Sequence, residues 1–366
     1  MNKRMFSLLA GMLAALMLLS ACGGDTPASS SSAPDISLEP AVSTLAPVEP
    51  EPMYTNPLTG LGTDVDLSAE RPVAIMLNNL RKALPQCGIA RADLIYEVPA
   101  EGGITRMMAV FQSLDEVDTL GSVRSARPYY VELAAGLDAI FIHAGGSDDA
   151  YSAIKKLGVF NIDGVNGPYG GTMFYRDSLR KKTAGFEHSL FTSKDRIETH
   201  LSGPLSKMRQ VHKEGYSLPL TFAPDGTPAQ GIAANGIDVE FSYYKTGRFT
   251  YDPDSKTYLV DQHIDKHDMP YVDGSTDEQV AVTNVLVLRT DINLIKGDSA
   301  GRLTVQLTGS GSGYFACGGA YIPINWTKES STAPFRFSTT DGQPLTLGAG
   351  TSYINIIDNS SSVFFR

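Results

Sequence analysis

Two apolar runs decide the fold class: Pro72-Val73-Ala74-Ile75-Met76-Leu77 and Ala139-Ile140-Phe141-Ile142-His143. Short continuous runs of this kind form strands that are buried on both faces of a sheet. Further strands are expected at residues 93–98 and 104–111, around a Gly102-Gly103 turn, and helices at residues 128–137 and 148–157. Strands and helices in alternation predict an α/β domain over residues 55–215.

The pattern changes after about residue 218. Seven β-branched or aromatic runs follow, separated by Gly, Asp, Asn and Pro, at residues 237–244, 248–251, 257–260, 280–289, 302–308, 321–326 and 352–357. Asp252-Pro253-Asp254-Ser255 is a hairpin turn signal, and the run at residues 309–313 indicates a flexible hairpin loop. Short strands at this spacing predict a mainly antiparallel β domain over residues 216–366, either a barrel or a sandwich.

The N-terminus has the features of a bacterial secretory signal. Lys3 and Arg4 precede an apolar stretch at residues 8–19, and Leu19-Ser20-Ala21-Cys22 follows. This ending resembles a lipobox, in which the Cys receives a diacylglycerol before the signal is cleaved; an ordinary cleaved signal or an uncleaved anchor is the alternative. We expect a signal peptide at residues 1–21 and lipidation of Cys22. The location is then the extracytoplasmic face of the bacterial cell membrane, with the membrane as a partner through the lipid anchor.

Composition separates a tether from the body. Residues 22–54 are rich in Ser, Ala, Pro and Glu and almost lack aromatic residues, so we expect them to form a disordered tether. The whole chain has 366 residues and a formal net charge of −10, which argues against a nucleic acid partner.

Cysteine usage is sparse. Cys87 and Cys317 fall in different expected domains, where either free thiols or an interdomain disulfide would fit. The sequence contains no Cys/His spacing of the C-x-x-C type. No metal site and no cofactor are therefore predicted.

Several motifs together carry a family resemblance. They are Asn56-Pro57-Leu58-Thr59-Gly60, Ala92-Asp93-Leu94-Ile95-Tyr96-Glu97, Glu101-Gly102-Gly103-Ile104-Thr105-Arg106, Val123-Arg124-Ser125-Ala126-Arg127-Pro128, His143-Ala144-Gly145-Gly146 and the run at residues 318–326. This set resembles the YerB family of bacterial lipoproteins. The resemblance implies a two-domain, lipid-anchored envelope protein and no particular activity. Where the family tends to have a Pro-His-Asn step, this chain departs from the pattern with Phe186-Glu187-His188-Ser189. His188 in this segment is a secondary candidate.

The run from Arg124 to Pro128 is the first candidate site. Pro128 suits the first position of a helix, so Arg124 and Arg127 lie at a helix N-terminus, where cations are disfavoured. A negative partner is therefore expected. It is either a bound phosphate, sulfate or carboxylate, or an internal carboxylate. The residues expected around such an anion are Arg106, Arg124, Ser125, Arg127 and Arg176, and the internal alternatives are Asp93, Glu97, Glu101 and Glu132.

His143 follows a buried strand and precedes a helix. It should lie at the carboxyl end of the sheet, where open α/β folds place ligands. His143 is a candidate general base or ligand, or else a histidine that is simply hydrogen-bonded in place. Asp148 is a secondary candidate, although capping also explains an acid in a first helical turn.

Glu97 and Glu101 form a third group with Arg106, on strands that a Gly turn brings together. Two nearby carboxylates could share the acid and base roles of a glycosidase. The alternative is a buried ion network.

The combined interpretation is an envelope lipoprotein whose α/β domain binds an anionic or polar ligand, a cell-wall polymer or an envelope protein. Whether the protein is an enzyme is left open, with a non-catalytic role favoured. A hydrolase or transferase acting on wall glycan is one alternative, and a non-catalytic assembly scaffold is the other.

Overall fold

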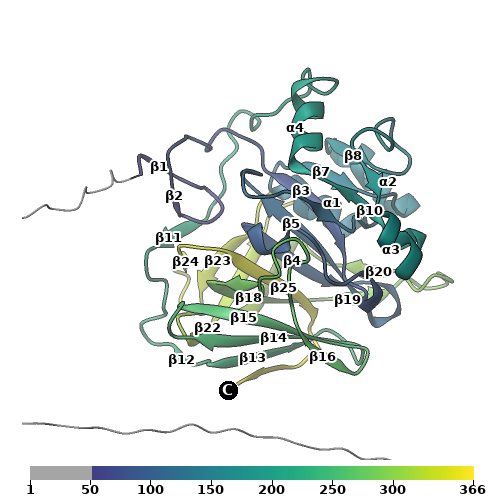
Figure 1. Ribbon diagram of the computed structural model, residues 1–366. Helices are drawn as coiled ribbons and strands as arrows, with labels where there is room; N and C mark the ends of the chain where they lie inside the picture. The colour runs from purple at the N-terminus through teal and green to yellow at the C-terminus, as the bar shows by residue number, and fades with distance from the viewer. Residues whose placement is uncertain (1–51) are drawn as a thin grey trace, which may run out of the picture. The chain divides into compact units, whose positions relative to one another are not determined.

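One eleven-stranded sheet runs through the molecule and contains strands from both halves of the chain (Figure 1). The computed structural model describes residues 52–366, so the signal peptide, Cys22 and nearly all of the expected tether lie outside the described residues. From one edge the sheet contains β8 (Asn161–Asp163), β7 (Ile140–His143), β3 (Val73–Asn78), β5 (Thr105–Phe111), β4 (Leu94–Pro99), β25 (Ser352–Asp358), β18 (Asn284–Thr290), β21 (Gly309–Cys317) and β22 (Ala320–Lys328), with β12 (Ile232–Ala233) and β23 (Arg336–Thr339) both paired to β22.

Strand direction brings several strand ends to one edge of this sheet. β7 and β8 run parallel to β3, while β25 runs parallel to both β4 and β18. Because β5 is antiparallel to both β3 and β4, those two strands also run in the same direction. The segments that follow β3, β4, β7 and β8 therefore meet at one edge, which we call the carboxyl edge.

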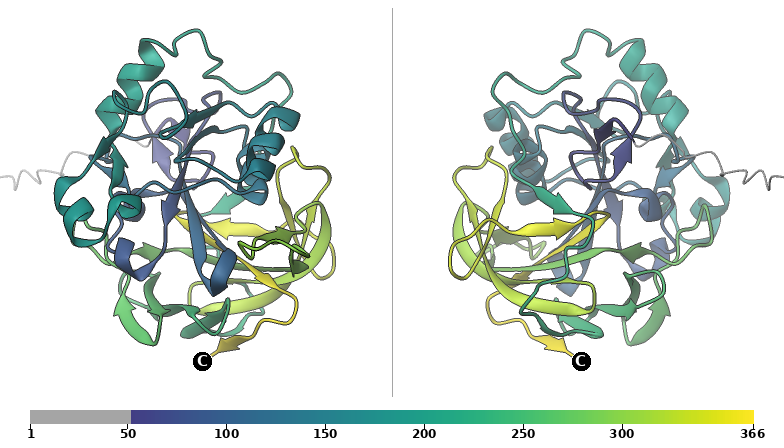
Figure 2. Two further views of the ribbon diagram at one scale, coloured as in Figure 1. Left: turned by 90° about the vertical axis from the view of Figure 1, so that its right-hand side faces the viewer. Right: turned by 90° about the vertical axis from the view of Figure 1, so that its left-hand side faces the viewer.

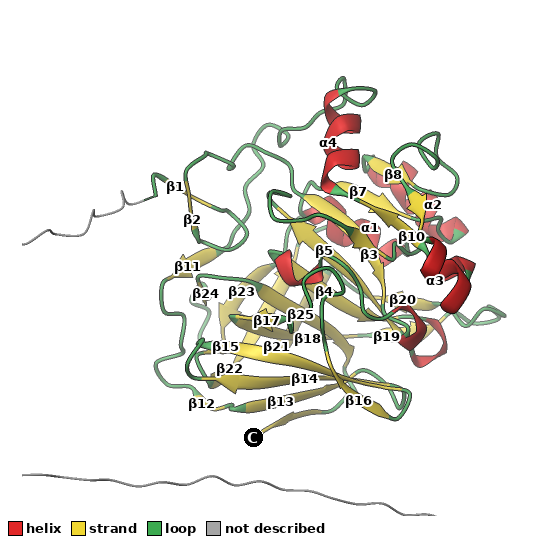
Figure 3. Cartoon of the chain, viewed as in Figure 1, coloured by secondary structure: helices red, strands yellow, loops and turns green. Residues whose placement is uncertain are grey.

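Within residues 52–366 the four α-helices all lie before residue 215: α1 (Pro128–Gly136), α2 (Asp148–Leu157), α3 (Ser178–Thr183) and α4 (Lys194–Ser202). Figures 2 and 3 show them in the upper part of the molecule, away from the C-terminus at the bottom. Pro128 occupies the first helical turn of α1, as expected, and Ser147 caps α2 by accepting a hydrogen bond from the backbone N–H of Ala150. No helix in residues 52–366 is long and apolar enough to cross a membrane.

A second, antiparallel sheet is built from the C-terminal half. It contains β13 (Gly236–Glu240), β14 (Lys245–Asp252), β15 (Thr257–Ile264), β16 (His267–Pro270), β17 (Ala281–Val282) and β26 (Val363–Phe365). Alternate residues of β15 are buried, which is the pattern of a strand with one face on the core. The predicted combination of an α/β N-terminal region and a mainly antiparallel β C-terminal region is confirmed.

Shorter elements complete the fold. The strands are β1 (Tyr54–Thr55) with β2 (Gly62–Thr63), β6 (Leu120–Gly121) and β9 (Tyr175–Arg176) on either side of β10 (Leu190–Thr192), β11 (Thr221–Ala223) with β24 (Thr346–Gly348), and β19 (Ile292–Leu294) with β20 (Leu303–Val305). The 3-10 turns are η1 (Arg81–Ala83), η2 (Ile89–Arg91), η3 (Glu101–Gly103) and η4 (Phe186–His188).

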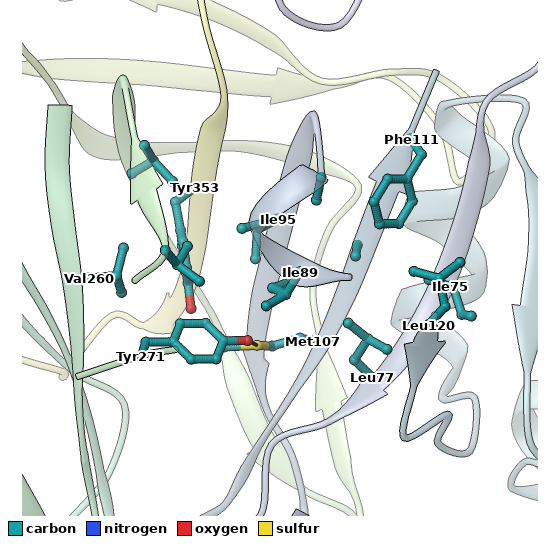
Figure 4. Close-up of a cluster of buried hydrophobic side chains, with 14 of the residues drawn as sticks. Ile75, Leu77, Ile89, Ile95, Met107, Phe111, Leu120, Val260, Tyr271 and Tyr353 are labelled. Carbon is teal, nitrogen blue, oxygen red and sulfur yellow. Dashed lines mark hydrogen bonds between the residues drawn. The ribbon is translucent and has the colours of Figure 1, made fainter. Parts of the chain in front are cut away.

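The hydrophobic core lies on both faces of the main sheet. On one face, Tyr271 and Val260 of the C-terminal half pack in the same cluster as Ile95, Met107 and Tyr353 (Figure 4). On the other face, the cluster contains the apolar side chains of α1 together with alternate residues of β3, β4 and β5. Both clusters contain residues from either side of residue 215, the expected domain boundary, which falls in the connection between α4 and β11.

Two local expectations about the C-terminal half were wrong. The residues expected as a flexible loop at 309–313 belong to β21, because their glycines let neighbouring groups approach closely. A Cβ on Gly311 would lie 2.6 Å from the Trp326 ring, and one on Gly313 would lie 2.1 Å from the Val287 carbonyl oxygen. Residues 352–357, expected in an antiparallel sheet, form the parallel strand β25. Cys87 and Cys317 are both free thiols.

Because both halves share one sheet and both core clusters, we expect them to unfold together. Trp326, the chain's single tryptophan, reports on the C-terminal half, and helical circular dichroism reports on the N-terminal half. In Ile354→Ala, which removes a buried side chain of β25, both signals should show the same loss of about 2–5 kcal/mol. Separate transitions for the two probes would show that the halves are independent.

Candidate functional site

The carboxyl edge brings together most of the residues singled out from the sequence. Residues 123–126 pass between the ends of β3 and β7: the Arg124 N–H donates to the Met76 carbonyl at 3.0 Å, and the Arg124 carbonyl accepts from the Ala144 N–H at 3.0 Å. η3 places Glu101 directly after β4, and His143 ends β7. The edge is thus built from strand ends whose positions the sheet fixes.

Glu101 is the negative partner at the start of α1. Its Oε1 accepts from Arg106 Nη2 at 2.5 Å and from Arg127 Nη2, and its Oε2 accepts from Arg127 Nε at 3.2 Å. Arg106 also donates to the Ser125 carbonyl at 2.6 Å, so Ser125 contributes its backbone to this group. Arg106 and Arg127 are buried. Of the two partners considered for Arg127, the structure places the internal carboxylate there.

These ion pairs set the protonation of Glu101. Partial burial raises the pKa of its carboxyl group, but the nearby guanidinium groups of Arg106 and Arg127 outweigh burial and lower the pKa below its ordinary value. Burial lowers the pKa of Arg106 to about 10, so this arginine stays charged at neutral pH. Glu101 is therefore ionised and has two partners, which is the opposite of what a general acid needs.

Glu97 lies deeper, in the core between the two sheets. Its Oε1 accepts from Thr105 Oγ1 at 2.5 Å and from Asn79 Nδ2 at 2.9 Å, and Lys245 Nζ lies 3.0 Å from the same oxygen. Its Oε2 accepts from the Tyr353 hydroxyl at 2.5 Å. Burial lowers the pKa of the Lys245 ammonium group, and the charge of Glu97 opposes that shift. With Glu97 enclosed and Glu101 ionised, the pair lacks the exposed, protonated acid that glycoside hydrolysis requires.

His143 is held on both sides. Its Nδ1 lies 2.9 Å from the Gly145 carbonyl oxygen and its Nε2 lies 3.0 Å from Asn161 Oδ1, and the residue is completely buried. With both nitrogens engaged, the ring has no free position for a substrate proton. Asp148 lies exposed in the first turn of α2, where it favours the helix electrostatically.

Arg124 differs from Arg106 and Arg127 because it reaches the surface. Both of its terminal nitrogens donate to one oxygen, Oε2 of Glu187, at 3.1 Å. The Glu187 side chain is 70% exposed, whereas that of Arg124 is 18% exposed. No polar atom of residues 52–366 is placed to accept a hydrogen bond from the buried Nε of Arg124.

His188 and Asn78 adjoin Arg124. The Nδ1 of His188 lies 2.8 Å from the Asn78 side-chain nitrogen, so the neutral ring accepts at Nδ1 and carries its proton on Nε2. Burial and the charge of Arg124 lower the pKa of His188, which keeps the ring neutral at pH 7. We refer to Asn78, Arg124, Glu187 and His188 as the edge site.

Arg176 contacts the η4 turn through Phe186. Its guanidinium carbon lies 3.8 Å from the centre of the Phe186 ring, and its Nη1 donates to the Phe186 carbonyl at 2.7 Å. Arg176 therefore supports the turn that carries Glu187 and His188, rather than sharing a partner with Arg124.

Comparison with known proteins agrees with this architecture. Residues 58–205 match the family model described as "Protein of unknown function (DUF3048) N-terminal domain", and residues 237–354 match that of the DUF3048 C-terminal domain. A Bacillus subtilis (strain 168) protein named "Putative lipoprotein YerB" is 31% identical over 317 residues, which cover 82% of this chain and 85% of that protein. The chain belongs to the YerB (DUF3048) family.

A solved structure supports the family assignment. The crystal structure of the YerB protein from Bacillus subtilis matches this chain with a TM-score of 0.71 and 28% sequence identity, over 85% of this chain and 99% of that one. The resemblance drawn from the sequence motifs is confirmed.

Sequence reasoning missed three residues that shape the edge of this YerB-family chain. Asn78 contacts His188, and Asn79 contacts Glu97. Asp163 accepts hydrogen bonds from the Gly145 N–H at 2.7 Å and the Tyr151 hydroxyl at 2.6 Å, and so fixes the turn after β7. Asn78 and Asp163 end β3 and β8, and Asn79 follows β3. Their place at strand ends was the available signal, because polar residues at such points meet at one edge of the sheet.

Breaking the Glu101 ion pairs should destabilise the fold. Arg127→Ala is expected to cost about 3–5 kcal/mol, because it leaves a partly buried carboxylate with one cation fewer. Unfolding in urea provides the measurement. A loss below 1 kcal/mol would show that these pairs contribute as little as exposed ones.

The same pairs predict a pH dependence. A carboxyl whose pKa is lowered in the folded state adds stability above its unfolded pKa of about 4.3, and this stability is lost as pH falls through the folded pKa. The stability difference between the wild type and Glu101→Gln should therefore stay constant from pH 7 to pH 5 and shrink below about pH 4. A difference that already shrinks above pH 5 would contradict a lowered pKa.

The buried pair of Glu97 and Lys245 predicts a third result. Lys245→Met alone should cost about 3–5 kcal/mol, because it leaves Glu97 without its counter-charge, whereas the double variant Lys245→Met/Glu97→Gln should recover part of that loss. Urea unfolding of the two single variants and the double variant measures the coupling. Additive losses would mean that the two groups act independently.

Proposed function

We propose that this YerB-family chain is a lipid-anchored protein of the bacterial cell envelope that binds an anionic envelope ligand at the edge site. The lipobox that ends at Cys22 supports the location at the extracytoplasmic face of the membrane, and so does the name of the B. subtilis relative, "Putative lipoprotein YerB". The ligand class follows from the contacts of Arg124.

The carrying observation is the incomplete pairing of Arg124. A guanidinium group presents its donors as a planar fork that fits two oxygens of a carboxylate or phosphate. Here both terminal nitrogens share a single oxygen of Glu187, whose side chain extends into solvent. An oxyanion with two available oxygens would fit this fork better than Glu187 does, and Glu187 can move aside because little else holds it.

The neighbours of Arg124 favour a phosphate or carboxylate group over a chloride ion. The neutral His188 ring carries a proton on Nε2, which can be donated to a ligand oxygen, and Asn78 fixes that tautomer. A cation beside a neutral donor suits an oxyanion on a larger polar molecule. Phosphate-bearing or carboxylate-bearing wall polymers have that chemistry.

The contacts of Glu101 and Glu97 bear on the two alternatives, a non-catalytic assembly scaffold and a hydrolase or transferase acting on wall glycan. The Glu101 group has the enclosed ion pairs of a scaffold, and we assign it the task of holding residues 123–127 in place. Hydrolysis of wall glycan is not part of the proposal, because neither Glu97 nor Glu101 is available as an acid.

Inorganic phosphate provides a direct test. With ionic strength matched by chloride, phosphate should raise the unfolding temperature of the wild type, because it binds only the folded state; the gain is about 2.7 kcal/mol at one hundred times Kd. Arg124→Ala should abolish this response. Glu187→Gln, which removes the competing charge, should enlarge it.

Arg302→Ala is the matched control. Arg302 also pairs with a single acid, Asp298, but lies far along the chain in the C-terminal half. This variant should keep the full phosphate response. A wild type that does not respond, or an Arg124→Ala variant that responds as the wild type does, would refute the edge site as an anion site.

A further inference from the structure

A surface beside the edge site combines exposed apolar and basic side chains. It is formed by η1, α3 and η4, and its members are Arg81, Lys82, Leu179, Lys181, Lys182 and Phe186; we call it the α3 face. Leu179 is 67% exposed and Phe186 is 58% exposed. All four basic residues are exposed. In Figure 1, α3 stands at the right-hand side of the molecule.

Contacts hold these elements together as one surface. Arg180 is the residue of α3 that turns toward the body, where its Nη1 donates to the Ala83 carbonyl at 2.9 Å and so joins α3 to η1. Lys181 Nζ lies 5.7 Å from the centre of the Phe186 ring, which joins α3 to η4. η1, α3 and η4 are therefore joined, and their exposed side chains lie on neighbouring elements.

The charge of the α3 face is opposite to that of the chain. Four of its six members are cations, whereas the whole sequence has a formal net charge of −10. The two nearest acids along the chain are already engaged: Asp177 caps α3 by accepting from the Arg180 N–H at 2.6 Å, and Glu187 pairs with Arg124. Asp177 keeps its negative charge in this hydrogen bond, but the four cations of the α3 face outnumber it, so the face stays positive and can attract an outside partner.

We propose that the α3 face docks on the anionic phospholipid surface of the membrane to which the chain is anchored. Lys and Arg bind anionic headgroups, and exposed Leu and Phe side chains enter the boundary between headgroups and acyl chains. A soluble polyanion would need the cations alone and would leave Leu179 and Phe186 in water. The docking uses the membrane location of the proposed function but does not depend on the edge site.

The chain is long enough for this orientation. Figure 1 shows β1, where the described residues begin, on the side opposite α3. A body of this size has a radius of roughly 25 Å, so a path around half of it measures roughly 80 Å. The residues between Cys22 and β1 number about 30 and reach up to ~100 Å when extended. A lipid on Cys22 and the α3 face can therefore contact the same membrane.

Vesicle sedimentation tests the docking without the lipid. The chain from residue 23 onward keeps the compact unit Glu51–Arg366 and lacks Cys22, so any binding comes from the body. It should bind vesicles that contain phosphatidylglycerol, should not bind vesicles of phosphatidylcholine alone, and should bind less as salt is raised. Lys181→Ala/Lys182→Ala should weaken binding roughly 30-fold, equivalent to about 1 kcal/mol per cation.

Two matched controls separate docking from a general charge effect. Lys155→Ala/Lys156→Ala removes two exposed, adjacent lysines from α2 and should leave binding unchanged. Leu179→Ser/Phe186→Ser should weaken binding several-fold, while Leu294→Ser, at a similarly exposed position, should not. If a control variant loses as much vesicle binding as the variant that it matches, the proposal is wrong.

Other outcomes identify a different partner or a different failure. If soluble polyphosphate competes fully and Leu179→Ser/Phe186→Ser binds as the wild type does, the α3 face serves a soluble polyanion and membrane docking is wrong. Absence of vesicle binding by the wild type rejects docking as well. Arg124→Ala should keep vesicle binding. If the wild type binds vesicles but its unfolding temperature does not respond to phosphate, only the edge site is rejected.

Discussion

The enclosed carboxylate of Glu97 is the constraint on which the rest of the structure depends. A buried ion pair with Lys245 is favourable only when geometry and further hydrogen bonds offset the loss of water around both charges. Here Thr105, Asn79 and Tyr353 supply those bonds from β5, from the end of β3 and from β25. One side chain thereby fixes how the C-terminal strands dock on the N-terminal sheet, with Asn355 paired opposite Glu97.

A second ionic group, formed by Glu101 with Arg106 and Arg127, lies nearer the surface and determines which arginine is left accessible there. Because β4 is fixed, η3 returns Glu101 to the start of α1, where Arg106 and Arg127 bind it from two directions. Arg106 also donates to the Ser125 carbonyl, which ties the segment that carries Arg124 to β5. The buried arginines consequently leave Arg124 as the one of the three whose carboxylate partner extends into solvent.

The sequence predicted local structure well and long-range pairing poorly. Apolar runs identified β3 and β7, and Pro128 and Ser147 marked the starts of α1 and α2, because these signals act within a few residues. The pairing of β25 with β4 joins residues more than 250 positions apart, and no local period encodes it.

The same limit applied at the site: the sequence placed a negative partner near Arg127 and named Glu101 among four acids, but only the fold distinguishes them. Lys245 was missed because a single Lys in a strand is normally predicted to face solvent.

The positive groups of this acidic chain differ in how water and salt reach them, and this difference separates their roles. Charges on the α3 face are exposed, so at an ionic strength of 0.1 M their field falls off over about 10 Å and acts only on a surface in contact. Arg124 is largely enclosed, with a side chain 18% exposed, so salt screens its attraction for an oxyanion less. Arg106 and Arg127 pair with Glu101 and contribute to the fold rather than to recognition. The buried arginines, the largely enclosed Arg124 and the exposed cations of the α3 face thus differ in burial. Burial, rather than the number of charges, determines whether each group stabilises the fold, binds a ligand or contacts a membrane.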